Sequence, residues 1–339
     1  MIIAVDIRGA EAYQHFIYET FKRITVQHPK HSFLFMFDKP YDPSFVFSEN
    51  VIPVIVKQQK ISLLTDHKIS SLLKKHKADI LVTAQPVSSK VPQCFIAFNN
   101  LAAGYVKKAK IIVMDSEYSV KEIIKKFNVD KEKVEIVYKG VDEKFNPISF
   151  DEREKIKEKY SDGNEYFLFS GEINSQIDLL NLLKAFSVFK KMQKSNMQLV
   201  ISLKKEMEKE FLEKLRLFKY KNEVKVLENI PREELATITS SAYVFVYPFE
   251  NEYSFPLEAM KSNVPVIVFN GGVLPEILSN AALYVNHSDH KDIADKMMLL
   301  FKDEKLRSEL IEKGKEQVKK YSWDKTADSL WKNIEKACR

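Results

Sequence analysis

One short stretch of the chain, residues 247–276, combines residue types that could hold a nucleotide. Pro256 suits the first turn of a helix, where its missing N–H costs nothing, and we expect Glu258 in the same turn. The helix dipole favours a carboxylate there, and this one could accept hydrogen bonds from a ligand. Gly271 and Gly272 follow a β-branched run and allow backbone N–H groups to approach a ligand closely. A carboxylate and a glycine pair after successive strands is how α/β sheets bind nucleotides; the alternative is a helix-terminal glutamate and an ordinary tight turn.

These residues need a sheet to position them, and the sequence predicts two. Short runs of β-branched and aromatic residues alternate with amphipathic helical patterns along the chain. The predicted strands are 1–7, 32–38, 51–57, 79–84, 93–98, 110–114 and 133–142, followed by 166–171, 198–203, 224–229, 243–248, 264–269 and 281–286. Two such series predict an α/β protein with two doubly wound parallel-sheet domains. We expect a ligand cleft between them, facing the carboxyl ends of the strands.

The polar, highly charged stretch 146–165 predicts the link between the two domains. We expect an N-terminal domain over residues 1–148, a second domain over 149–320 and a terminal segment over 321–339. Two capping boxes are predicted at helix starts, one from Ser119 with Glu122 and one from Ser149 with Glu152. The terminal segment is amphipathic, with Trp323 and Trp331 on its buried side.

The composition is that of a globular protein of two ordinary domains. The chain has 339 residues, 45% of them hydrophobic, and no apolar run is long enough to span a membrane. It has two cysteines and begins directly with a strand pattern rather than a secretory signal, so we expect a cytoplasmic location. The net charge of +6 comes from lysines spread over helices, which predicts solvated helix faces. A weak peripheral contact with an anionic membrane such as the inner membrane is the alternative.

Several kinds of chemistry lack their sequence patterns. The seven histidines have no metal-ligand spacing, so no metal site is predicted, and there is no P-loop or GxGxxG motif. Aromatic residues do not interleave with basic ones, so we expect no nucleic acid partner. Glycine is scarce, with 8 residues where average usage gives about 24. The chain therefore has few places to build a loop that cradles phosphates.

The string YPFENEYSFPLEAMKSNVPVIVFNGGVLPEIL, followed by AALYV, resembles the signature of the family 4 retaining glycosyltransferases, which have the GT-B fold. The strings DSEYSVKEIIKKFNVDKEKVEIVYKGVDEKFNP and YFLFSGEINSQIDLLNLLKAF resemble the family's interdomain segment and the start of its nucleotide-binding domain. The ending YSWDKTADSLWKNIEK resembles its final helix, which crosses back to the N-terminal domain. The resemblance covers most of 110–339 and, more loosely, 1–100. It implies that 1–148 is an acceptor-side Rossmann-like domain, shortened near residue 100, and that 149–320 binds a nucleotide sugar.

The resemblance also implies roles for particular residues. The family has two glutamates separated by seven residues, as Glu250 and Glu258 are here. Glu258 then binds the ribose, and Glu250 lies near the donor sugar as the catalytic carboxylate, with Glu252 as the alternative because this loop is short. The implied donor-binding residues are Gly171, Glu258, Gly271, Gly272 and Val273.

The chain departs from the family where charge must be neutralised. A leaving diphosphate needs positioned cations or a metal, because negative charge develops as the glycosidic bond breaks. The family has an Arg and a Lys where Gln176 and Ile177 stand here, and Asp178 adds a negative charge. Lys204 and Lys205 follow a predicted strand and could replace the missing pair, although they also suit the start of a solvated helix.

The N-terminal half departs from the family as well. Gly9 stands alone in the loop after the first strand, where the family is rich in glycine. Asn99 and Asn100 occupy the place of a family histidine.

Two functions therefore remain open from the sequence. In the first, the protein transfers a sugar from a nucleotide diphosphate sugar to a glycan or lipid-linked acceptor with retention, without a cofactor or an essential metal. In the second, it is a catalytically impaired pseudoenzyme that serves as partner or scaffold of an active glycosyltransferase. The missing cations, the missing histidine and the scarcity of glycine motivate the second.

Overall fold

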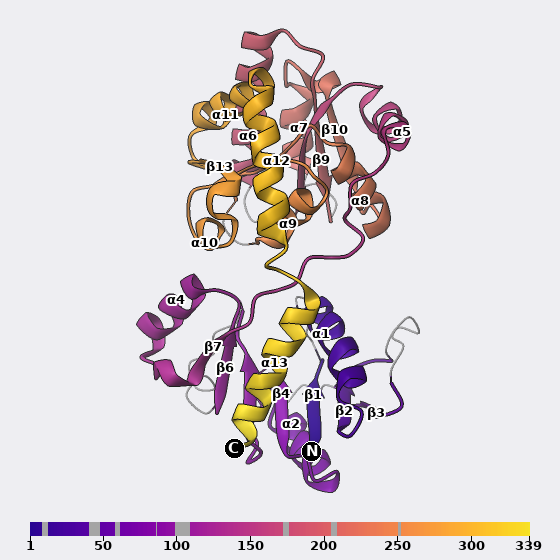
Figure 1. Cartoon of the computed structure of the whole chain (residues 1–339), viewed down its shortest axis with the longest axis vertical. Helices are drawn as coiled ribbons and strands as arrows, with labels where there is room; N and C mark the ends of the chain where they lie inside the picture. The colour runs from indigo at the N-terminus through magenta and orange to yellow at the C-terminus, as the bar shows by residue number, and fades with distance from the viewer. Residues whose placement is uncertain are drawn as a thin grey trace. The chain divides into compact units, whose positions relative to one another are not determined.

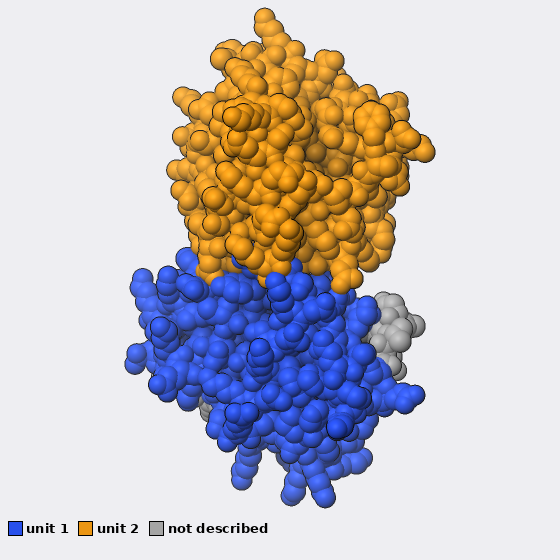
Figure 2. All heavy atoms as spheres, in the orientation of Figure 1, with its two compact units in different colours: residues 1–140, 321–339 blue, residues 141–320 orange. Residues whose placement is uncertain are grey.

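The computed structural model describes residues 1–8, 13–40, 48–57, 62–85, 87–98, 109–171, 176–204, 209–249 and 252–339, with only the backbone described for 62–63, 176–178 and 209–210. The chain divides into two compact units (Figure 2). Unit 1 contains Met1–Gly140 and Tyr321–Arg339, and unit 2 contains Val141–Lys320. The sequence-based boundary after residue 148 lies eight residues inside unit 2.

Unit 1 is built on a seven-stranded parallel sheet with strand order β3-β2-β1-β4-β5-β6-β7. The strands are short and mostly buried, as their apolar runs predict. They are β1 (Ile2–Asp6), β2 (Ser32–Phe37), β3 (Val51–Ile55), β4 (Ile80–Thr83), β5 (Gln93–Ile96), β6 (Ile111–Met114) and β7 (Val134–Ile136). Its helices in the described ranges include α1 (Gln14–Gln27), α2 (Ser62–Lys75), α4 (Glu117–Phe127) and α13 (Trp323–Cys338).

Helix α13 completes the core of unit 1 from the far end of the chain. It packs against α1 and the central strands (Figure 1), and Trp323, Leu330 and Trp331 are buried in the same cluster as Phe16. The ring of Trp331 stacks on the ring of His28, with centroids 3.7 Å apart.

The start of α13 lies close to the last residue of the first segment of unit 1. A Cβ atom added to Gly140 would lie 2.3 Å from the backbone nitrogen of Trp323, so only glycine fits here. The chain therefore leaves unit 1 and re-enters it at one place.

Unit 2 is built on a six-stranded parallel sheet with strand order β10-β9-β8-β11-β12-β13. Its strands are β8 (Tyr166–Gly171), β9 (Gln198–Leu203), β10 (Val224–Glu228), β11 (Val244–Tyr247), β12 (Val266–Phe269) and β13 (Ala282–Val285). Its helices are α5 (Phe150–Ser161), α6 (Gln176–Gln193), α7 (Lys209–Arg216), α8 (Arg232–Ser241), α9 (Ser254–Lys261), α10 (Leu274–Leu278), α11 (His290–Lys302) and α12 (Glu304–Val318). Two sheets of parallel strands with flanking helices confirm the predicted GT-B type of fold.

The two predicted capping boxes at helix starts have different outcomes. The capping box of Ser149 and Glu152 is confirmed, and it begins α5, which packs against α8 inside unit 2. The box of Ser119 and Glu122 is wrong, because α4 begins at Glu117 and Ser116 is its N-cap. Ser119 donates its backbone N–H to the Ser116 side chain, so a serine three residues earlier takes the capping role.

Candidate functional site

The strand order of unit 2 defines where a ligand can bind. From β8 the chain continues to β9 and β10 on one side, whereas β11, β12 and β13 lie on the other side. All strands are parallel, so their carboxyl ends share one edge of the sheet, and the order reverses between β8 and β11. Such a reversal leaves a crevice outside the carboxyl ends of the two strands. Gly171 ends β8 and Tyr247 ends β11, so both residues lie at this position.

Gly171 is constrained by its own backbone and by two aromatic rings. Its φ angle is 155°, a conformation that favours glycine. A Cβ atom added here would lie 3.0 Å from the Tyr247 ring and 3.4 Å from the Phe255 ring. The position of residue 171, at the reversal of strand order, therefore favours a residue without a side chain.

Lys204 lies on the neighbouring strand end. It follows Leu203, which pairs in register with Gly171. Its ammonium group lies over the ring of Phe255, 5.5 Å from the centroid. Because that ring also faces Gly171, one of the two predicted phosphate-binding lysines is near the predicted donor loop. Lys205, the other lysine, lies outside the described residues.

Glu258 is buried at the same edge, with 3% of its surface exposed. Helix α9 begins at Ser254, so Pro256 lies in the first turn as predicted, but Glu258 is the fifth residue. The prediction that Glu258 lies in the first turn is wrong, and the end of the helix dipole does not explain its charge. Burial raises the pKa of Glu258 to about 7, although the nearby Arg232 guanidinium favours the ionised form.

Arg232, the first residue of α8, is the partner of Glu258. Its Nη2 donates a hydrogen bond to Glu258 Oε1, and its Nε donates to Asp142 Oδ2 at 3.0 Å. The guanidinium group lies 4.6 Å from the centroid of the Phe145 ring. Lys261 Nζ donates to the Asp142 backbone carbonyl at 3.0 Å. The predicted ribose ligand is therefore part of a charged network that joins α8, α9 and the start of unit 2.

This network contains the residues that sequence reasoning missed. Arg232 did carry a signal, because it stands at the first position of a helix, where the dipole disfavours a cation. A cation at that position indicates a specific anionic partner. Asp142 had no such signal, because it becomes adjacent to Arg232 only through the fold.

The second predicted carboxylate is described only in part. Glu252 Oε1 accepts hydrogen bonds from Ser254 N at 3.0 Å and from Ser254 Oγ at 2.7 Å, so it orders the first residue of α9. It lies close enough to Glu258 to contribute to the raised pKa of that carboxyl group. Glu250, the predicted catalytic carboxylate for which Glu252 is the alternative, lies outside the described residues.

The loop after β12 takes the predicted form. Gly272 has a φ angle of 58°, in the left-handed region that favours glycine. A Cβ atom on Gly271 would lie 2.3 Å from the Phe269 ring. Val273 is buried and precedes α10. Gly272 is therefore favoured by its backbone angle, whereas a larger residue at 271 would require the Phe269 ring to move.

Several residues that mark departures from the family cannot be placed. Gly9, Asn99, Asn100 and the 172–175 loop lie outside the described residues. The side chains of Gln176, Ile177 and Asp178 are not described either, although α6 includes their backbone.

The carboxyl edge of the sheet in unit 1 has a buried ion pair of its own. Arg8 donates from Nε and Nη2 to the two carboxylate oxygens of Asp6, both at 2.8 Å. Thr83, at the end of the neighbouring strand, donates to Asp6 at 3.4 Å. The two-point pairing keeps Arg8 in place at the end of β1.

Comparisons with known proteins agree with this architecture. The family model described as "Glycosyl transferases group 1" matches residues 150–317. The chain is 34% identical over 208 residues to the O-antigen chain mannosyltransferase RfbU of Salmonella typhimurium, covering 59% of this chain and 54% of that protein. It is 27% identical over 220 residues to the O-antigen chain mannosyltransferase B of Escherichia coli, covering 64% and 58%. The chain thus spans little more than half the length of these curated relatives.

Solved structures match over nearly the whole chain. A glycosyltransferase from Rickettsia africae superposes with a TM-score of 0.83 at 15% identity, covering 99% of this chain and 98% of that one. The Anabaena protein Alr3699/HepE in complex with UDP-glucose gives a TM-score of 0.77 at 10% identity, covering 99% of both chains. At these identities the structures show a shared fold. Over residues 150–317, within its second unit, this chain is therefore similar to the glycosyl transferases group 1 family.

No helix in the described ranges combines the length and apolar character needed to cross a membrane.

Proposed function

We propose that the protein is a glycosyltransferase that moves a sugar from a nucleotide diphosphate sugar to a glycan or lipid-linked acceptor with retention of configuration. One observation supports the proposal: Gly171, Lys204 and Glu258 lie along one carboxyl edge of the unit 2 sheet, around the reversal of strand order, within the segment that the family model matches. The mannosyltransferase relatives make a mannose nucleotide the first donor to test. UDP-glucose is the second, because a structural neighbour was solved with it.

The proposed roles follow from the chemistry at the sheet edge. The Glu258 carboxylate accepts hydrogen bonds from the ribose hydroxyls, and the bare backbone around Gly171 and Gly271 approaches the donor. Lys204 provides positive charge for the leaving diphosphate, the role that two cations have in the family. Glu250, or Glu252 in its place, contacts the donor sugar. The expectation that no metal is essential is tested by activity in the presence of EDTA.

The second candidate is a pseudoenzyme that keeps the fold and serves as partner or scaffold of an active glycosyltransferase. A specific observation favours it, because the Glu258 carboxyl group is paired with Arg232. A ribose must compete with this ion pair, in which Glu258 is buried and whose charged hydrogen bond is stronger than a neutral one.

Calorimetric titration of the whole protein with UDP, GDP, UDP-glucose and GDP-mannose tests both candidates, followed by a transfer assay with the donor that binds. Micromolar binding with transfer supports the enzyme. Micromolar binding without transfer or hydrolysis supports the pseudoenzyme. Absence of binding at millimolar nucleotide overturns the nucleotide-sugar site itself.

Replacing Lys204 with glutamine tests its proposed role directly. We expect kcat to fall about 10²–10³-fold, because the lost charge acts on the diphosphate as it leaves. Donor affinity should change much less than kcat. Lys302→Gln, on an exposed face of α11 in the same unit, is the matched control. Equal activity of the two variants would remove Lys204 from the mechanism.

A further inference from the structure

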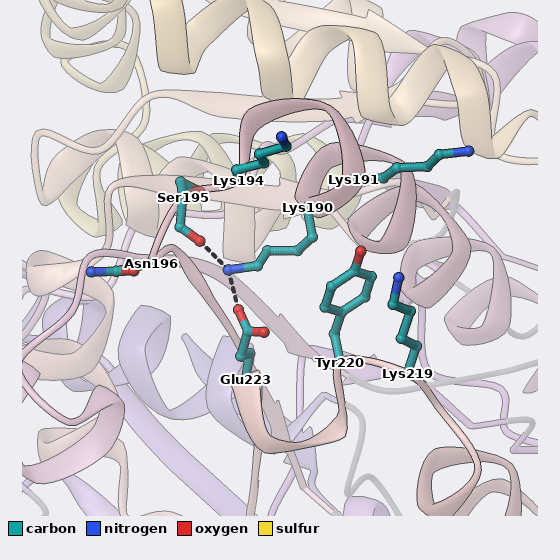
Figure 3. Close-up of a pocket in the computed structure, with 8 residues that line it drawn as sticks. All are labelled: Lys190, Lys191, Lys194, Ser195, Asn196, Lys219, Tyr220 and Glu223. Carbon is teal, nitrogen blue, oxygen red and sulfur yellow. Dashed lines mark hydrogen bonds and ion pairs between the residues drawn. The ribbon is translucent and has the colours of Figure 1, made fainter.

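A basic pocket lies at the opposite edge of the unit 2 sheet from the candidate donor site. Helix α6 follows the carboxyl end of β8 and ends before β9 begins, so the turn after it lies at the amino edge. The short helix Lys221–Glu223 precedes β10 at the same edge. Between them is a surface pocket of about 520 Å³ (Figure 3). Its lining residues are Lys190, Lys191, Lys194, Ser195, Asn196, Lys219, Tyr220 and Glu223.

One lysine and the glutamate of this pocket neutralise each other. Lys190 is buried, with 6% of its surface exposed, and forms an ion pair with Glu223. Its ammonium group also donates to the backbone carbonyls of Ser195 and Met197. These three acceptors use all three N–H groups of Lys190. Lys190 therefore fixes the turn between α6 and β9 and adds no free charge.

The other three lysines leave the pocket strongly positive. Lys191, Lys194 and Lys219 are exposed, and Figure 3 shows their ammonium groups separate from that of Lys190. Across the described ranges, no carboxylate forms an ion pair with any of the three. Lys219 instead lies over the ring of Tyr220, 5.2 Å from its centroid. Three uncompensated positive charges thus surround one opening.

Two large apolar side chains border these lysines in the sequence. Met192 follows Lys191 and is 63% exposed. Leu217, two residues before Lys219, is 88% exposed, more than any other large apolar side chain in the described part of the chain. Exposed apolar groups beside lysines are the combination that binds the boundary between lipid headgroups and acyl chains. A solvated helix face needs no such apolar groups.

We propose that this lysine–leucine patch, formed by Lys191, Met192, Lys194, Leu217 and Lys219, binds an anionic lipid surface. The three ammonium groups meet phosphate-bearing headgroups, and Leu217 and Met192 enter the headgroup region. Lysines held next to such a surface are attracted by its negative potential, which decays within a Debye length of the surface. The patch would hold unit 2 at a membrane by the sheet edge opposite the candidate donor site. This proposal does not depend on catalytic activity.

Cosedimentation of the whole protein with vesicles tests the proposal. We expect binding to mixed phosphatidylcholine–phosphatidylglycerol vesicles, none to pure phosphatidylcholine, and release by salt. The triple variant K191E/K194E/K219E should bind at least about tenfold more weakly, since each lysine contributes to attraction. The matched control K302E/K305E/K313E reverses three exposed lysines of α11 and α12, so both triples have a formal net charge of zero.

A second variant separates lipid binding from simple attraction between charges. Leu217→Ser leaves every lysine in place and should weaken binding to mixed vesicles severalfold. Thermal unfolding of each variant confirms that it is folded. Equal loss in both triples, full binding by the patch triple, or unchanged binding by Leu217→Ser would each overturn the proposal. So would competition by inorganic phosphate for the pocket with no effect on vesicle binding.

Discussion

The buried carboxyl group of Glu258 is subject to two opposing effects. Removal from water favours its neutral form, whereas the Arg232 guanidinium favours the ionised form. Burial is the larger effect, so the pKa of Glu258 lies at about 7. The same pair raises the pKa of Arg232, which stays charged throughout the physiological range. Protonation of Glu258 near neutral pH therefore changes the charge of the candidate site.

This pKa predicts how ligand affinity depends on pH. The ionised carboxylate accepts hydrogen bonds from ribose hydroxyls better than the neutral acid, and its population rises as pH rises through 7. The affinity for a nucleotide diphosphate sugar should therefore increase about tenfold from pH 6 to pH 8. Calorimetry at several pH values measures it, and the phosphates of such a donor do not titrate in this range.

Glu258→Gln should bind the donor more weakly and lose the pH dependence. Glu309→Gln, an exposed glutamate of α12, is the control and should keep both affinity and pH dependence. If the Glu258→Gln variant retains the same rise in affinity, another group titrates and Glu258 does not bind the ribose.

The sequence predicted where candidate site residues lie in the fold better than it predicted which charged residues they pair with. Glu258, Gly171 and Gly272 have the burial or backbone angles expected of a site at strand ends. The Arg232 pairing could not be derived, because residues 142, 232 and 258 are far apart in the sequence and meet only through tertiary structure. Local patterns report helices and strands, whereas the charge of a site depends on which loops meet.

Several helices and loops end in a conformation for which glycine is the usual choice, but this chain uses other residues. In the described ranges, non-glycine residues with positive φ are Lys77, Asn128, Asp162, Lys194, Asn229, Asn263 and Ser279. Asparagine and aspartate tolerate this region because their short side chains form local hydrogen bonds. The low glycine content therefore reflects how elements end, and not only a lack of phosphate-binding loops.

Lys77, just after α2, offers a direct test of this feature. Its φ angle is 52°, where a lysine is strained and a glycine is not. Lys77→Gly should raise the free energy of unfolding by about 0.5–1 kcal/mol. Chemical denaturation measures the change.

A lysine-to-glycine substitution inside α2 should instead lower the free energy of unfolding. Lys68 is exposed in the middle of this helix, where glycine costs about 1 kcal/mol. Lys68→Gly is therefore the matched control. Loss of stability in both variants would mean that the backbone at residue 77 changes its conformation rather than relieving strain.

The strands and most helices could be predicted because their apolar residues recur with a clear strand or helix period. The first residues of helices were harder to predict, as two cases show. Helix α4 starts at Glu117 and is capped by Ser116 rather than by Ser119, since both serines fit a capping pattern. Helix α9 starts at Ser254, and Pro256 fits any position of a first turn, so it could not fix where Glu258 falls.

At the scale of the whole molecule, the two units differ in how they are assembled from the chain. Unit 2 is one continuous segment, whereas unit 1 needs α13 from beyond unit 2. Apolar side chains of α13 form part of the unit 1 core, with Leu330, Ile334 and Ala337 fully or almost fully buried. The resemblance predicted a returning helix, but the sequence could not specify Gly140 as the point of close approach.

Expression of separate segments tests this difference. Residues 141–320 should fold cooperatively alone, because the sheet and helices of unit 2 form one compact body. Residues 1–140 should not, since they lack the α13 side chains of the core. Circular dichroism and thermal unfolding measure both. Cooperative unfolding of 1–140 alone would show that α13 is dispensable for the core.

The return of the chain at Gly140 also sets an order of events during synthesis. A ribosome completes all of unit 2 before it makes α13, and at roughly 5–20 residues per second this takes on the order of ten seconds or more. Throughout that time the site that receives Trp323 and Trp331 is open to solvent. The nascent first segment then exposes an aromatic-rich surface until α13 is made, so we expect the protein to need a chaperone most during this period.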